Sequence, residues 1–191
     1  MPRENYRLRK MANLVKHRKS VLDIGWADKP NSFLNNDMVT GLDLVKKQKP
    51  ENYSKVVCGN AMDLNHIFVS GMFDAILAGE LLEHLENPLG FIRNCMEVLS
   101  PGGVLIITTP NPNSPIERIL TLFLNRNYFY SKNHVMLYPQ RWLIRIMEIG
   151  GCVSVKLHSG GFPFPGTELI PFPRPWCYQT IAVGYKSEEL K

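Results

Sequence analysis

The sequence predicts an α/β fold, in which a doubly wound and mainly parallel sheet carries helices on both faces. Two observations support this fold class. Short apolar segments alternate along the chain with amphipathic segments of helical spacing. Glycines or acidic residues directly follow several of the apolar segments, as occurs where parallel strands end beside a ligand. The chain has 191 residues, which fits one domain spanning residues 1–191.

Seven segments are expected to form strands because they are short, apolar and bounded by turn-forming residues. They comprise residues 21–25, 38–43, 55–58, 73–78, 104–109, 153–158 and 180–185. Residues 104–109 give the strongest strand pattern, and the segment Pro101–Gly103 before them is expected to be a turn.

Four segments are expected to form helices. The first is a basic amphipathic helix within residues 1–20, with apolar residues on one side. The second runs over residues 88–99, and Pro88 suits a first helical turn. The third begins at Ser114-Pro115-Ile116-Glu117, a capping pattern. Its inward side chains are expected to be Ile116, Ile119, Leu120 and Phe123. The fourth spans residues 140–149 and ends at a glycine pair.

The charge distribution disfavours a nucleic-acid partner. The net charge is +5, but residues 1–20 carry seven basic side chains and one acidic side chain, so the remaining chain is near −1. A nucleic-acid footprint needs a basic face on the domain itself. The favoured interpretation is a solvated helix with Leu8, Met11, Leu14 and Val15 inward. The alternative is an arm that meets anionic lipid or RNA.

The composition predicts a cytoplasmic protein. No apolar run approaches the roughly 20 residues of a membrane-spanning helix, and the basic N-terminus lacks the apolar block of a secretory signal. Cys58, Cys95, Cys152 and Cys177 form no Cys-x-x-Cys pair, which disfavours a zinc ribbon. Reduced thiols are expected, with the first three cysteines buried.

The chemically informative residues follow the first four predicted strands in order. Gly25 ends the first strand, where backbone can approach a ligand closely. Asp43 ends the second and is placed to accept hydrogen bonds from ribose hydroxyls. Met62 and Asp63 follow the third, where a carboxylate and an apolar side chain could meet an adenine. The small residues of Ala78–Glu80 close the fourth.

Taken together, these segments resemble the class I S-adenosylmethionine-dependent methyltransferase family. The resemblance covers about residues 18–158 and is nearest to ubiquinone-pathway O-methyltransferases and small-molecule or sugar methyltransferases. The matching segments are Val21–Gly25 (VLDIG), Gly41–Asp43 (GLD), Gly59–Asp63 (GNAMD), Phe73–Ile76 (FDAI), Glu83–Pro88 (EHLENP) and Leu99–Gly103 (LSPGG).

The resemblance implies a Rossmann-like, seven-stranded sheet with an antiparallel last strand, and S-adenosylmethionine as cofactor. It assigns Gly25 and its loop to the methionine part, Asp43 to the ribose and Asp63 to the adenine. The loop departs from the family pattern, because Ala27 and Lys29 stand where glycines are usual, and the helix after it looks very short. The expected cofactor-binding residues are Asp23, Gly25, Trp26, Ala27, Asp43, Leu44, Met62, Asp63, Ala78, Gly79 and Glu80.

A second group of residues could bind a divalent metal such as Mg²⁺ or Zn²⁺. Glu80, Glu83 and His84 have the spacing i, i+3, i+4, which places them on one face of a helix, and His134 lies in a later irregular segment. Such a metal could lower the pKa of an acceptor hydroxyl. The pattern resembles small-RNA 2′-O-methyltransferases. Alternatively His84 or His134, beside Glu83, serves as a general base without metal.

Residues 110–133 and 159–176 are interpreted as acceptor-side insertions, because both are irregular and rich in aromatic residues. The leading hypothesis is methyl transfer to an oxygen, or less readily a nitrogen, of a small molecule, lipid or glycan precursor. The alternatives are a homologue that binds S-adenosylmethionine weakly or without catalysis, and an RNA 2′-O-methyltransferase. The oligomeric state is not predicted.

Overall fold

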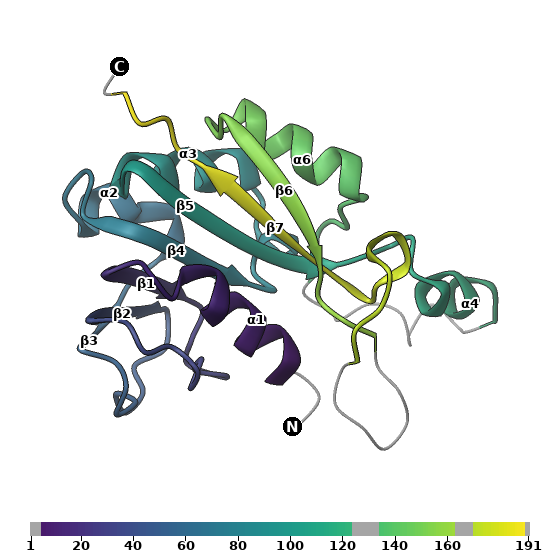
Figure 1. Ribbon diagram of the computed structural model, residues 1–191, viewed down its shortest axis with the longest axis horizontal. Coiled ribbons are helices and arrows are strands. Elements are labelled where there is room, and N and C mark those ends of the chain that lie inside the picture. The colour runs from purple at the N-terminus through teal and green to yellow at the C-terminus, as the bar shows by residue number, and fades with distance from the viewer. Residues whose placement is uncertain (1–4, 124–133, 163–169, 190–191) are drawn as a thin grey trace.

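The computed structural model describes residues 5–123, 134–162 and 170–189 and contains a seven-stranded sheet (Figure 1). Its strands are β1 (Ser20–Ile24), β2 (Met38–Asp43), β3 (Lys55–Cys58), β4 (Phe73–Gly79), β5 (Leu99–Pro110), β6 (Ser154–Ser159) and β7 (Gln179–Tyr185). The strand order is β3-β2-β1-β4-β5-β7-β6. Only β7 is antiparallel to its neighbours, which confirms the expected Rossmann-like sheet with an antiparallel last strand.

Helices cover both faces of this sheet. The α-helices are α1 (Asn5–Val15), α2 (Leu64–Ile67), α3 (Pro88–Val98), α4 (Pro115–Phe123) and α6 (Gln140–Ile149). The elements η2 (Ala61–Asp63), η3 (Leu82–His84) and η4 (Arg174–Trp176) are single 3₁₀ turns. The described residues contain no helix that is long and apolar enough to cross a membrane.

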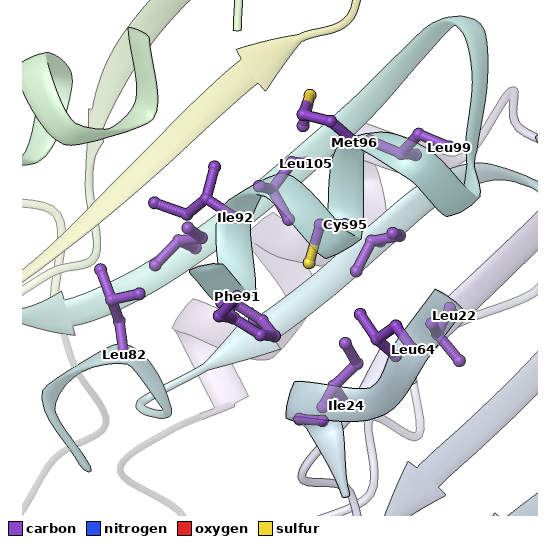
Figure 2. Close-up of a cluster of buried hydrophobic side chains, with 14 of the residues drawn as sticks. Leu22, Ile24, Leu64, Leu82, Phe91, Ile92, Cys95, Met96, Leu99 and Leu105 are labelled. Carbon is purple, nitrogen blue, oxygen red and sulfur yellow. The ribbon is translucent and has the colours of Figure 1, made fainter. Parts of the chain in front are cut away.

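The larger core cluster lies between the sheet and helices α2, α3 and α6. Alternate side chains of the central strands point to this face, including Leu22, Ile76 and Leu105. Phe91 and Ile92 of α3 pack against them and are fully buried (Figure 2). A fully buried side chain of this size stabilises the fold by about 2–3 kcal/mol.

The opposite face is covered by α1 and by the loops after β1 and β2. Met11 and Val15 of α1 pack on the intervening side chains of the strands. Trp26 lies in the same cluster, and its ring sits directly over Gly41 of β2. A Cβ atom at Gly41 would lie only 2.6 Å from the Trp26 Nε1 atom, so the tryptophan requires glycine there.

Several sequence expectations need correction. Residues 25–37 form turns and no helix. Residues 101–103 do not form a separate turn; they belong to β5, whose pairing with β4 is irregular between Phe73 and Ala75. Cys58 is exposed, because β3 is an edge strand, whereas Cys95 and Cys152 are buried as expected. Ile119 of α4 is 57% exposed instead of inward. The predicted inward positions of Leu120 and Phe123 fall on side chains that are not described.

Candidate active site

A cavity of about 270 Å³ opens beyond the carboxyl ends of β1, β2, β3 and β4. This is the position at which open α/β sheets bind ligands. Its lining combines apolar side chains with backbone and carboxylate groups. The lining residues are Ile24, Gly25, Asp28, Leu42, Asp43, Leu44, Gly59, Asn60, Ala61, Glu80, Leu81, His84 and Leu85.

The loop after β1 reaches this cavity through Gly25, whose φ of 78° favours glycine. Its backbone N–H donates to the Leu42 carbonyl oxygen at 2.9 Å. In the loop that follows, Lys47 Nζ donates to the Ala27 carbonyl at 2.9 Å and to Asp28 Oδ1 at 2.7 Å. These contacts hold the loop in place beside the cavity.

Asp43 lies at the mouth of the cavity, where β2 ends. Its Oδ2 accepts the Ala27 N–H and its Oδ1 accepts the Val45 N–H, both at 2.9 Å. These bonds fix the carboxylate but use only part of its capacity, since each carboxylate oxygen has two acceptor sites. Asp43 is therefore oriented and can still accept two hydroxyl donors from a ligand.

Asp23 occupies a different environment, although it lies only two residues before Gly25. It is 6% exposed and accepts a hydrogen bond from the Tyr53 hydroxyl, beneath the floor of the site. Burial raises the pKa of Asp23 to about 6, against the opposing effect of the Tyr53 hydrogen bond. Asp23 does not line the cavity, so its contribution is to the structure under the loop.

Glu80 ends β4 in a left-handed conformation with a φ of 52°, uncommon for a residue with a side chain. Its Oε1 accepts the Thr108 hydroxyl at 2.8 Å and lies 3.1 Å from Arg7 Nη1. Its Oε2 accepts Gln179 Nε2 at 2.9 Å. Arg7 itself is 4% exposed and also donates to Thr108 Oγ1 at 2.8 Å. Both oxygens of Glu80 are therefore engaged by the protein.

Next to the cavity, Glu83, His84 and His134 converge. One possible ligand atom from each lies within 4.8 Å of the others. The His84 and His134 rings are 4.7 Å apart between centroids. The segment carrying His134 is held on η3 because the N–H groups of Val135 and Met136 donate to the Glu83 carbonyl at 2.7 and 3.3 Å. Since His84 also lines the cavity, the two parts of the site share a wall.

The electrostatics of this cluster follow from its burial. Glu83 is fully buried, and this burial, followed by the charge of Glu80, raises the pKa of Glu83 above its usual range. Partial burial and the neighbouring His84 lower the pKa of His134. His134 is thus neutral at neutral pH, as a metal ligand or a proton acceptor must be.

The predicted site residues divide into three groups. Gly25, Asp43, Leu44, Glu80 and His84 line the cavity. Seven others lie outside the lining: Asp63 is exposed, Met62 and Gly79 are half-buried, and Asp23, Trp26, Ala27 and Ala78 are buried. Glu83 and His134 form the third group, in the neighbouring cluster. The structure does not bring Glu80 into the Glu83–His84–His134 group, because its left-handed backbone precludes the helix face assumed from the spacing.

Sequence reasoning missed several residues of the site. Asn60 lines the cavity, and its side chain accepts the Met62 N–H at 2.9 Å. An asparagine before a short helical turn was the available signal. Arg7 and Gln179 were missed because their partner Glu80 lies 73 and 99 residues away in the chain.

A second cavity, of about 380 Å³, lies between α6 and the segment before it. Its walls are almost wholly apolar, and Trp142 on α6 is 61% exposed there. Tyr138 belongs to this wall and is itself buried. This apolar groove therefore begins at the same segment that carries His134.

Comparison with known proteins shows that this chain is similar to methyltransferases. The family described as "Methyltransferase domain" matches residues 25–107. A ubiquinone biosynthesis O-methyltransferase from Chromobacterium violaceum is 32% identical over 107 residues, covering 50% of this chain and 46% of that protein. One from Dechloromonas aromatica is 33% identical over 111 residues, with the same coverage. The chain thus spans about half the length of these curated relatives.

Solved structures agree on the fold. A methyltransferase from Thermotoga maritima, described as a possible histamine N-methyltransferase, superposes with a TM-score of 0.76 at 16% identity, covering 97% of this chain and 90% of that one. A 1,6-didemethyltoxoflavin-N1-methyltransferase from Burkholderia thailandensis, solved with S-adenosylhomocysteine, gives a TM-score of 0.62 at 14% identity, with coverages of 96% and 79%.

Proposed function

Because this chain belongs to the class I S-adenosylmethionine-dependent methyltransferase family, we propose that it transfers a methyl group from this cofactor to an oxygen of a small molecule, lipid or glycan precursor. The observation that carries the proposal is the cavity at the strand ends, where Gly25 and the oriented Asp43 share the lining with His84 of the Glu83–His84–His134 cluster. The names of the curated relatives support oxygen as the acceptor atom.

In the proposed reaction, an acceptor oxygen attacks the sulfonium methyl group as its bond to sulfur breaks, leaving S-adenosylhomocysteine. The protein contributes alignment of the two reactants and removal of the acceptor proton. Asp43 binds the ribose hydroxyls, and the Gly25 backbone lies beside the methionine part. His134, neutral at neutral pH, is suited to receive the proton when the cluster holds no cation.

The chemistry of Glu83, His84 and His134 also fits a divalent cation. One carboxylate and two imidazoles form a common donor set, and both Glu83 oxygens are buried with no hydrogen-bond partner among the described residues. A cation held by these residues would lower the pKa of an acceptor hydroxyl. We propose this version of the site, without Glu80.

The apolar groove supports an acceptor with an apolar part. It starts at the segment that carries His134 and continues along α6 past Trp142. A wholly polar acceptor would leave these walls unused, whereas each buried methylene group adds about 0.8 kcal/mol to binding.

Titration with S-adenosylhomocysteine tests the cofactor site. We expect wild-type protein to bind it and Asp43→Asn to bind about 10- to 100-fold more weakly, because charged hydrogen bonds are lost. Asp37→Asn is the control, since Asp37 is exposed outside the cavity. Wild-type protein that does not bind at millimolar ligand would refute the proposal. Asp63→Asn tests the adenine role in the same assay, which unchanged affinity would exclude.

Titration with Mn²⁺ tests the cation. We expect one bound ion per chain, with binding abolished by Glu83→Gln because the substitution removes the only charged ligand of the group. Glu86→Gln, three residues further on, is the matched control, because Glu86 is exposed. Binding of S-adenosylhomocysteine without binding of Mn²⁺ would instead favour His134 or His84 as a metal-independent base.

A further inference from the structure

Four side-chain oxygens gather around the cluster without a hydrogen-bond partner among the described residues. They are both carboxylate oxygens of Glu83, the Thr109 hydroxyl and the Tyr138 hydroxyl. Glu83 and Thr109 are fully buried, and Tyr138 is 4% exposed. Buried polar groups in folded proteins almost always have a partner, so a local group of unsatisfied oxygens indicates a role that the protein atoms alone do not fulfil.

These oxygens come from η3, from β5, which packs against η3, and from the segment before α6. Glu83 lies on η3 directly after Leu82, and Thr109 lies near the end of β5. The chain around Tyr138 is fixed to η3 by the two N–H groups that donate to the Glu83 carbonyl. His134 and Tyr138 are therefore parts of one segment that passes along Glu83.

The electrostatics agree with this arrangement, because Glu83 interacts with each of the two hydroxyls. Tyr138 has a raised pKa because of burial and, after that, the charge of Glu83. The Thr109 hydroxyl opposes the rise in the pKa of Glu83. Neither hydroxyl makes a well-aligned hydrogen bond to this carboxylate. A hydroxyl beside a buried carboxylate can bond to it directly or through one water, which would complete the hydrogen bonding of both groups.

We propose that Thr109 and Tyr138 are positioning residues, whose hydroxyls orient the Glu83 carboxylate toward the divalent cation bound by Glu83, His84 and His134. The inference rests on the proposed cation site and extends it. Carboxylate ligands are commonly held by such outer hydrogen bonds, and loss of one weakens metal binding by about 10- to 100-fold. Tyr138 has a second role, because its ring also forms the wall of the apolar groove.

Mn²⁺ affinity of the full chain tests the proposal without any acceptor. We expect Tyr138→Phe and Thr109→Val each to raise the Kd by about 10-fold or more. Thr109→Ser keeps the hydroxyl and is expected to retain wild-type affinity. Two matched controls remove hydroxyls elsewhere and are expected to change nothing: Thr40→Val, buried in β2, and Tyr185→Phe, at the end of β7.

Two results would overturn the proposal. One is wild-type Mn²⁺ affinity in both Tyr138→Phe and Thr109→Val while Glu83→Gln abolishes binding. The other is a wild-type chain that binds S-adenosylhomocysteine but no Mn²⁺, which refutes the positioning role and leaves methyl transfer itself standing. Unchanged far-UV circular dichroism verifies that each variant is folded.

Discussion

Asp23 is a buried carboxyl whose ionisation opposes folding. Its Oδ2 accepts the Tyr53 hydroxyl, and the Asn31 N–H in turn donates to the Tyr53 oxygen at 3.0 Å. These bonds favour the ionised form but do not offset burial, so the pKa of Asp23 is about 6 in the folded protein against 3.8 for the ordinary group. The folded protein therefore holds this proton over a pH range in which the unfolded chain has released it.

The consequence is a pH-dependent stability. The contribution of Asp23 is fully present below pH 4 and is lost as pH rises through about 6, by up to about 3 kcal/mol. Asparagine does not titrate, so wild type alone loses this contribution as pH rises. In urea titrations we therefore expect the free energy of unfolding of Asp23→Asn, minus that of wild type, to increase from pH 4.5 to pH 7.5. Parallel pH profiles of the two proteins would contradict this. Tyr53→Phe should move the wild-type step to higher pH, because the hydrogen bond that lowers the pKa is removed.

At the residue scale, the sequence predicts those site residues that lie at the carboxyl ends of strands. Gly25 and Asp43 were found because each follows an apolar run, and the structure places both at the cavity. Trp26 was assigned to the cofactor site from its position in the loop, but its ring turns inward onto Gly41. The direction of a side chain in a turn depends on tertiary packing, which local sequence does not specify.

Helix α1 is attached to the active site through one buried ion pair. Arg7 is the buried basic residue of a helix whose other described basic side chains, Arg9 and Lys10, are exposed or half-buried. Asn31 Nδ2 also donates to the Leu8 carbonyl at 3.0 Å, which fastens the helix to the loop after β1. The basic N-terminal helix thus packs on the domain through one face, as expected, but this buried face includes the side chain of Arg7.

Replacing Arg7 should destabilise the fold and loosen Glu80. We expect Arg7→Met to lower the free energy of unfolding by about 2–3 kcal/mol, less than for a fully buried pair because the Glu80 side chain is 24% exposed. Arg9→Met is the matched control on the exposed face of α1. Adding Glu80→Gln to Arg7→Met should recover at least about 1 kcal/mol. Additive effects of the two substitutions in urea unfolding would count against the pair.

At the element scale, helices with a regular apolar periodicity could be predicted from the sequence, whereas segments with irregular backbone could not. The predicted helix at 88–99 is α3, with the Asn87 side chain accepting the Gly90 N–H at 2.9 Å as its cap. The predicted helix at 140–149 is α6. The helix expected to hold Glu80 and Glu83 together is only a 3₁₀ turn, because Glu80 adopts a left-handed conformation before it. That conformation is unusual for glutamate and has no sequence signature.

For the whole molecule, alternation of strands and helices predicts the α/β class but not the order of strands. The family resemblance supplied the antiparallel last strand, and the sheet confirms it. The acceptor-side expectations for 124–133 and 163–169 lie outside the described residues. The apolar groove along α6 was not predicted, because it is formed jointly by α6, the segment before it and Leu89 of α3, which only the tertiary structure brings together.

The position of β7 has a consequence for how the protein is made on the ribosome. Of the seven strands of the sheet, β7 is the last to be synthesised, yet it occupies the position between β5 and β6. After β5 emerges, translation at about 5–20 residues per second needs about 4–15 s to reach Tyr185. Throughout that interval β5 presents an apolar, unpaired edge, and Glu80 lacks Gln179. Until β7 is added, this edge of β5 is available for pairing with other chains or for capture by chaperones.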